Sequence, residues 1–130
     1  MPTNVSIYQN YNRWVMEASV PLSSAGAVGT VVGQGATCVK SNTGLYTVTI
    51  SNPTGLMLSA VLNSSATLRD AAVGTIKDVG VKSVTQDSTT GAIEIVFRTV
   101  NAAGADTDEA TDALVVDVSA VIQTGPMTAW

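Results

Sequence analysis

The sequence predicts an all-β protein: an antiparallel β-sandwich or jelly-roll-like barrel of about eight strands, with an N-terminal arm and a short C-terminal tail. Short runs rich in Val, Ile and Thr alternate with turns rich in Gly, Asn and Ser. These turns recur at intervals of roughly 8–12 residues, which is typical of sandwiches and barrels. No helix-length window shows the 3.6-residue apolar stripe that would indicate an amphipathic helix.

Two hairpins are the clearest elements. Residues 36–50 contain two strand-like runs around the turn 41–44, in which Gly44 can adopt a positive φ. Residues 79–99 repeat this pattern around the turn 86–91. In the run 45–50, Tyr46, Val48 and Ile50 are expected on one face and Leu45, Thr47 and Thr49 on the other.

The remaining elements follow from turn and breaker residues. We expect an arm over residues 1–13, the sandwich over 14–122 and a tail over 123–130. Within the sandwich, Pro21 should end the first strand, and the Gly-rich stretch 22–35 should be a loop leading into a bulged strand. The other expected elements are strands at 56–62, 66–70 and 113–122, a turn at 63–65, and an acidic loop at 101–112 with a short helix candidate at 108–112.

Composition excludes several classes of protein. The chain of 130 residues has 12% charged residues, a net charge of −4 and only six basic residues, which are scattered. Nucleic acid is therefore not expected as a direct partner, because phosphate binding needs clustered positive charge. The one cysteine excludes an intrachain disulfide. We expect no secretory signal, no membrane span and synthesis in a cytoplasm, because no signal-like or 18-residue apolar stretch is present.

The residues offer little catalytic chemistry. Histidine is absent, and Glu94 alternates with Ile93 and Ile95 in a way that favours a solvent-facing strand residue over a glycosidase acid. Cys38 lacks a His to activate it and should be a small buried residue. We therefore predict no enzymatic activity and no cofactor.

The acidic loop contains the metal candidates, which are weak ones. Asp106, Asp108 and Asp112 could supply oxygen ligands to a hard cation such as calcium. The loop lacks the glycine and the final Glu that an EF-hand loop requires, so a solvated polar loop is the favoured interpretation.

Large side chains near both ends of the chain are the candidate interface residues. Amphipathic aromatic residues are favoured in interfaces, and sandwich edges need a cover. In the alternative interpretation, Trp14 fills the sandwich and the other side chains fold over an edge. The candidate interface residues are Tyr8, Tyr11, Trp14, Met127 and Trp130.

Several segments together resemble the small β-sandwich capsid decoration (cement) proteins of tailed bacteriophages. In that family a Gly-aromatic-x-Val strand follows a turn, a Ser-Gly-x-Ile-x-Ile strand comes later, and an acidic loop precedes the last long strand. The corresponding segments here are 44–46, with one extra residue before Tyr46, then 90–93, and 106–112 before 114–122; the likeness spans residues 35–122.

The resemblance implies a non-enzymatic structural protein of the virion. It would bind the outside of a phage capsid and stabilise contacts between major capsid subunits. Its partners would be the major capsid protein and itself, as a homotrimer. Its location would be the capsid surface, after synthesis in the host cytoplasm. Attachment through arms and edges would involve residues 2–14 and 123–130.

Three other functions stay open. A carbohydrate- or receptor-binding module, such as a fibre tip, would need an exposed aromatic platform, for which the middle of the chain offers Tyr46 and Phe97. A small metal-dependent enzyme would use the acidic loop. A tail-tube or connector component would share the virion but not the capsid surface.

Overall fold

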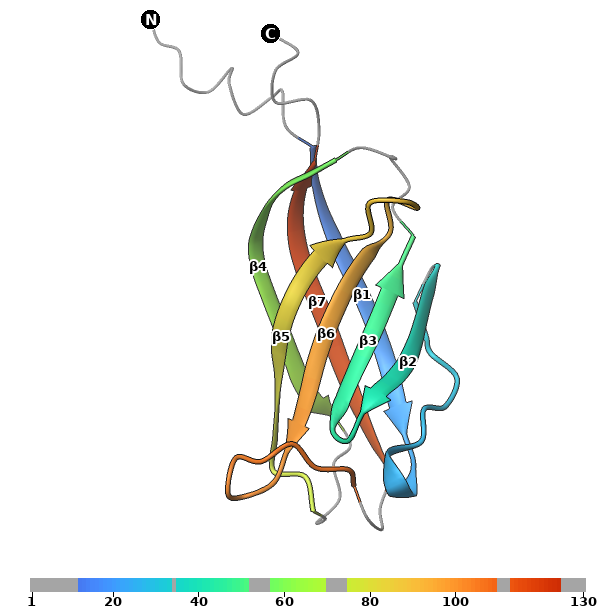
Figure 1. Cartoon of the computed structure of the whole chain (residues 1–130), viewed down its shortest axis with the longest axis vertical. Helices are drawn as coiled ribbons and strands as arrows, with labels where there is room; N and C mark the ends of the chain where they lie inside the picture. The colour runs from blue at the N-terminus through green and yellow to red at the C-terminus, as the bar shows by residue number, and fades with distance from the viewer. Residues whose placement is uncertain (1–11, 34, 52–56, 70–74, 110–112, 125–130) are drawn as a thin grey trace, which may run out of the picture.

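The computed structural model describes residues 12–33, 35–51, 57–69, 75–109 and 113–124, and over these ranges the fold is nearly all β. Its two antiparallel sheets confirm the predicted β-sandwich (Figure 1). Among the described residues, no helix has the length and apolar character needed to cross a membrane. The strands are β1 (Asn12–Leu22), β2 (Ala36–Asn42), β3 (Leu45–Ile50), β4 (Leu58–Arg69), β5 (Asp78–Gln86), β6 (Ile93–Val100) and β7 (Leu114–Thr124), with a 3-10 turn, η1, at Ser24–Gly26.

The strands form one sheet of three strands in the order β1-β7-β4 and one of four in the order β2-β3-β6-β5. The hairpins β2–β3 and β5–β6 lie within the larger sheet, as the turn residues predicted, and the other connections cross between sheets (Figure 1). β1 begins and β7 ends at the same end of the sandwich, which we call the terminal end. The opposite end, the base, contains η1, the β2–β3 turn and the loop before β7 (Figure 1).

Strict alternation of side chains builds the core between the sheets. Along β6 and β7, every second residue is buried, because successive side chains of a strand point to opposite faces. Tyr46 and Phe97 lie side by side on β3 and β6 and stack with ring centroids 5.0 Å apart. The predicted inward face of β3 is confirmed, since Tyr46, Val48 and Ile50 are all buried.

Two strand predictions were wrong. Pro21 does not end the first strand, because β1 continues to Leu22. The backbone of Pro21 faces away from β7, toward the loop whose Gly29 N–H donates to the Pro21 carbonyl, so the missing N–H breaks no bond to β7. Residues 63–65 are not a turn, because β4 runs through them as one strand. Two expected strands thus become one, and the described residues contain seven strands.

The expected helix at 108–112 is not present at residues 108 and 109, and residues 110–112 lie outside the described ranges. The described residues between β1 and β2 form the expected loop, with isolated bridges to β1 at Val28 and Val32, and the strand that follows, β2, has a register shift between Lys40 and Asn42.

The two long sides of the sandwich differ. On one side β4 lies against β5, which brings the two sheet edges together. On the other side, β1 and β2 have no comparable contact. Only the base half of β1 is covered there, by the loop 28–33 through the bridges Ser19–Val32 and Leu22–Val28. This open side positions the surfaces described next.

Candidate interaction surface

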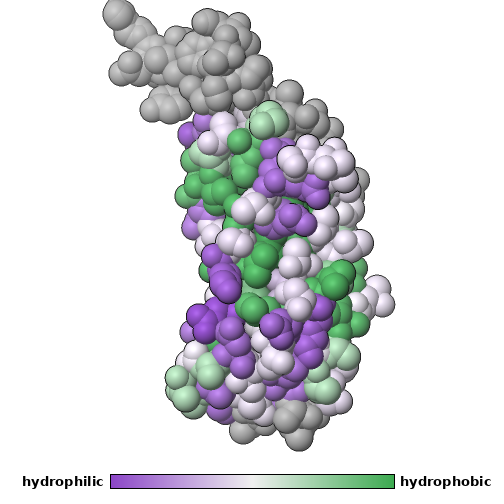
Figure 2. Space-filling view, in the orientation of Figure 1, coloured by the Kyte–Doolittle hydropathy of each residue, from purple (hydrophilic) through white to green (hydrophobic). Residues whose placement is uncertain are grey.

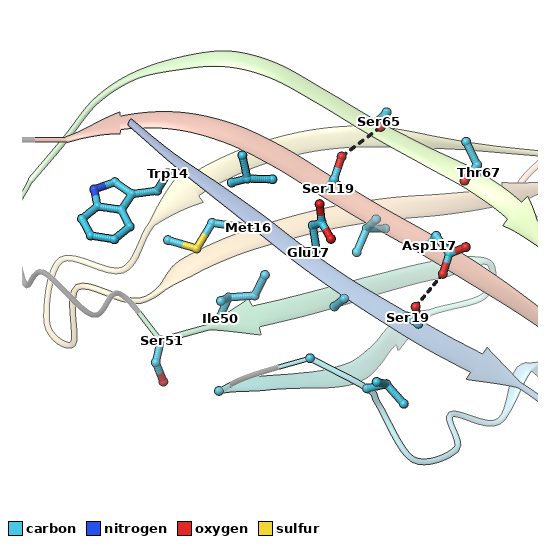
Figure 3. Close-up of a pocket in the computed structure, with 16 residues that line it drawn as sticks. Trp14, Met16, Glu17, Ser19, Ile50, Ser51, Ser65, Thr67, Asp117 and Ser119 are labelled. Atoms are coloured by element: carbon cyan, nitrogen blue, oxygen red, sulfur yellow. Dashed lines mark hydrogen bonds between the residues drawn. The ribbon is translucent and has the colours of Figure 1, made fainter. Parts of the chain in front are cut away.

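No element among the described residues covers the outer face of the three-stranded sheet, which is the first candidate surface. With the open side of β1 it forms a shallow groove of about 1090 Å³. Along the groove, Trp14 lies at one end and the pair formed by Ser19 and Asp117 at the other (Figure 3). The stretch between them is lined by Glu17, Ser65 and Ser119 on the outer face and by apolar side chains, among them Met16 and Ile50, on the open side of β1.

Asp117 links all three strands of this face. Its carboxylate accepts a hydrogen bond of 2.6 Å from Ser19 Oγ on β1 and one of 2.7 Å from Arg69 Nε on β4. The Arg69 guanidinium and the Ser19 hydroxyl both stabilise the charged form, so the pKa of Asp117 lies below its ordinary value. A second link joins Ser65 to Ser119 across β4 and β7 (Figure 3). The face is therefore fixed by its own hydrogen bonds.

Among the described residues, no strand or bridge pairs with β1 on the side away from β7 at its terminal-end half. Ser19 exchanges two backbone hydrogen bonds with Val32, so its N–H and C=O point away from β7. β1 pairs with β7 without interruption, so the backbone groups of Arg13, Val15 and Glu17 point the same way as those of Ser19. The loop stops covering this edge at Glu17, where a Cβ added to Gly33 would lie 2.9 Å from the Glu17 carbonyl oxygen. Beside this edge, the Val15 side chain is 61% exposed.

Exposed apolar side chains also gather at the start of β4, in what we call the terminal patch: Met57, Val61 and Leu62. Met57 is 74% exposed and precedes Leu58, which pairs with Thr124 at the end of β7, and Val61 and Leu62 follow along the same strand. The register shifts between Val61 and Asn63, so Leu62 is an extra residue, and a bulge of this kind exposes neighbouring side chains together. Figure 2 shows apolar surface at this end on the β4 side.

Of the predicted interface residues, only Trp14 lies in the described part of the chain. Its ring packs against the core, and its Nε1–H donates to Thr124 Oγ1 at 2.9 Å. Trp14 is thus partly buried, as expected of a side chain that fills the sandwich, and it also lines the groove, as an interface residue could. Tyr8, Tyr11, Met127 and Trp130 lie outside the described residues.

At the base, the described part of the acidic loop is docked onto the sandwich. Asp108 accepts hydrogen bonds from Lys40 Nζ at 2.6 Å and from the Gly44 N–H at 2.8 Å. Tyr46 Oη, fully buried beside it, donates to the Gly26 carbonyl at 3.0 Å. Burial and the negative charge of Asp108 raise the pKa of Tyr46. Burial opposes ionisation of Asp108, but its bonds to Lys40 and Gly44 outweigh this effect and lower its pKa.

The two described metal candidates face different partners. Asp106 forms an ion pair with Arg98 at 2.7 Å, whereas Asp108 pairs with Lys40. Between them and the core, Glu109 is buried and accepts a hydrogen bond from the Ile76 N–H. Within the described ranges no group of three or more His, Cys, Asp or Glu side chains could hold a metal ion. Asp112 lies outside those ranges.

The structure also shows where Glu94 and Cys38 lie on their strands. Glu94 is half-buried on the outer face of β6, opposite the buried Ile93 and Ile95, as alternation predicted. Cys38 packs against the core from β2, and burial raises the pKa of its thiol to about 11. A thiol with this pKa is protonated near neutral pH and is a poor nucleophile.

The exposed edge of β1 and the terminal patch were not predicted. Alternation in residues 14–20 places Val15 on the outer face, but sequence does not show which strand lies at a sheet edge. Pro21 is the one signal, because proline is confined to edges within sheets. No protein-family model, curated protein or solved structure matches this chain.

Proposed function

We propose that this chain is a non-enzymatic structural protein that attaches to the outside of a phage capsid and reinforces contacts between major capsid subunits. The resemblance to capsid decoration proteins supports the choice of partner. The terminal patch supports attachment as the activity: it exposes Met57, Val61 and Leu62. Large exposed apolar side chains that lie together are typical of protein interaction sites.

The terminal patch is the observation that carries the proposal. Residues 1–11 and 125–130 adjoin β1 and β7 at this same end, and they contain the other four predicted interface residues. A capsid contact there would combine an apolar anchor on the sandwich with the aromatic residues of both terminal segments. The base would face away from the capsid, with its acidic loop docked against β3 and η1.

The first test is a copy count by quantitative mass spectrometry of purified virus particles. Near-stoichiometric copies relative to the major capsid protein are expected. A few copies per particle would move the protein to the tail or a fibre, and its absence would refute the virion role.

A binding assay on capsids stripped of this chain then tests the terminal patch. Val61→Ser should weaken co-sedimentation at least about tenfold, the effect of losing about 1.4 kcal/mol of contact energy. Val39→Ser is the control, because Val39 is an exposed valine on β2, away from the patch, and is 65% exposed against 40% for Val61. Deleting residues 2–11 should also abolish binding while the sandwich stays folded. Equal binding by the Val61→Ser and Val39→Ser variants would exclude the terminal patch as the site of capsid attachment.

A carbohydrate-binding role is the second candidate, favoured by the polar side chains on the outer-face part of the groove. Its hydroxyls, Glu17 and the partly buried Trp14 are side chains of the kind that sugars contact. Tyr46 and Phe97 cannot serve as the aromatic platform, because both are fully buried. A saturable signal on a glycan array would favour this role over capsid attachment.

A further inference from the structure

Charged side chains are distributed unevenly between the two ends of the sandwich. Among the long stretches of sequence without Asp, Glu, Lys or Arg are residues 1–12, 41–68 and 118–130. Each of these three stretches includes residues of the terminal end, because β1 and β4 begin there and β7 ends there (Figure 1). The base instead contains the ion pairs Lys40–Asp108 and Arg98–Asp106 and the buried Glu109. The two ends therefore differ in charge as well as in apolar exposure.

The charged side chains placed closest to the terminal end by the described strands are Arg13, Asp87 and Glu94, and none belongs to the terminal patch. The Asp87 carboxylate accepts hydrogen bonds from the N–H groups of Thr89 and Thr90 within its own turn. Arg13 also has an interaction partner. Glu94 lies on the outer face of the other sheet, which points away from β4. No charge of one sign therefore dominates the surroundings of the patch.

We propose that the terminal patch binds an uncharged, largely apolar surface of a partner protein, so that attachment depends on burial of apolar area and not on charge. This inference rests on the proposed function, because it names the chemistry of the capsid surface that this end would contact. The patch side chains are aliphatic or thioether groups, and their exposed neighbours on β4, Ser59 and Asn63, are polar but neutral. Burial of apolar surface is the main favourable term in most protein association.

A charged partner surface would fit the patch poorly. A charge placed against Met57, Val61 or Leu62 would lose its water and gain no opposite charge, which is unfavourable. Residues 1–11 and 125–130 contain no charged side chain either, so any contact that they add is equally uncharged. The inference therefore depends on the sequence of these two segments and not on where they lie.

A lipid surface is the other apolar partner to compare with a protein. Segments that bind at membrane surfaces are typically rich in Lys and Arg, which face the anionic headgroups. The described part of the terminal end offers Arg13 alone, and Arg13 already has a partner. The charge distribution therefore favours a protein surface over a lipid surface.

Salt dependence tests the proposal on the unmodified, full-length chain. The Kd for stripped capsids, measured by co-sedimentation, should rise by less than about threefold between about 0.1 M and about 1 M NaCl, although the Debye length falls from about 10 Å to about 3 Å. A larger loss of affinity would show that opposite charges make the contact; it would overturn this inference and leave capsid attachment intact. Absence of binding at every salt concentration would refute the proposed function and this inference with it.

Substitutions of both signs test the charge of the partner surface. Val61→Lys and Val61→Glu should each weaken binding at least about tenfold, because either charge would be desolvated against apolar groups. Val39→Lys and Val39→Glu on β2 are the controls and should bind like the unmodified chain, and urea unfolding checks that all four variants fold. Tighter binding by one Val61 variant and weaker binding by the other would show a charged partner surface and overturn the proposal. Binding unaffected by both substitutions would also overturn it.

A flotation assay with phosphatidylcholine vesicles separates the two apolar partners. The unmodified chain should not float with the vesicles at a concentration that saturates stripped capsids. Flotation that Val61→Lys and Val61→Glu both abolish would assign the terminal patch to a lipid surface and overturn the proposal.

Discussion

Lys40 and Asp108 lie 68 residues apart in the sequence and form an ion pair of 2.6 Å at the base of the sandwich. The pair connects β2 to the acidic loop before β7. The same carboxylate accepts the Gly44 N–H of the β2–β3 turn, so one side chain holds the loop against the hairpin. The loop is therefore part of the folded unit over its described residues, and its charge contributes to stability.

We expect Asp108→Asn to reduce the stability at pH 7 by about 1–2 kcal/mol, because it weakens charge-assisted hydrogen bonds in a partly exposed site. The pKa of Asp108 is lowered from its ordinary 3.8, so its stabilisation is present above that value and is lost as pH falls through the folded-state pKa. The free energy of unfolding, measured with urea between pH 7 and about pH 2, should therefore fall less steeply with decreasing pH in the variant than in the unmodified protein.

Asp106→Asn is the control for this measurement. It removes the Arg98 ion pair, whose side chains are 42% and 34% exposed. A pair this exposed contributes at most about 1 kcal/mol, and the loss should be smaller than for Asp108→Asn. Equal losses and identical pH profiles would show that Asp108 has no special role in docking the loop.

A substitution at Gly44 tests how closely the acidic loop packs against the β2–β3 turn. Its φ is +64°, and an added Cβ would lie 2.4 Å from the Thr107 backbone nitrogen. Gly44→Ala combines left-handed strain with a backbone clash and should cost about 2–4 kcal/mol in urea unfolding. Gly104→Ala is the matched control, because Gly104 has a φ of +81° but no atom within 4 Å of an added Cβ. It should cost only about 1–2 kcal/mol, and a similar cost at both positions would argue against the docked loop.

The sequence predicted the sandwich because its local signals agree with the tertiary structure. The hairpin turns contain glycines at positive φ, at Gly44 and Gly91, and the strands beside them alternate regularly. β4 was missed because Asn63 and its two serines have turn-like chemistry. These residues lie on a strand paired along its length with β7, where tertiary pairing overrides local propensity.

The candidate surfaces were less predictable, for a physical reason. Exposure of Val15 depends on β1 lying at an edge, and exposure of Leu62 depends on a bulge, and neither is determined by local pattern. Asp106 and Asp108 read as one acidic cluster in sequence. The fold separates them by pairing each with a basic residue from a different strand, Arg98 on β6 and Lys40 on β2.

The hydrogen bond from Trp14 to Thr124 should couple the two termini of the described fold. Thr124 is fully buried at the end of β7, and Trp14 Nε1 donates to its hydroxyl at 2.9 Å. A double-mutant cycle with Trp14→Phe and Thr124→Val should give a coupling energy of about 0.5–1.5 kcal/mol in urea unfolding. Ser65→Ala is a control that should not couple with Trp14→Phe, because Ser65 bonds to Ser119 instead. If the losses of unfolding free energy for Trp14→Phe and Thr124→Val were additive, the hydrogen bond between the two side chains would be contradicted.

The reactivity of the Cys38 thiol can be predicted and measured directly, because Cys38 is the one cysteine in the sequence. Burial raises the pKa of its thiol from 9.0 to about 11, so the thiolate fraction near pH 8 should be roughly a hundredfold lower than in an unfolded chain. Reaction with a thiol reagent should be correspondingly slow in the folded protein and should accelerate about tenfold per pH unit up to the raised pKa. Addition of urea should restore the rate of a free thiol. Fast labelling without urea, with saturation near pH 9, would show that Cys38 lies open to solvent and that β2 does not hold it against the core.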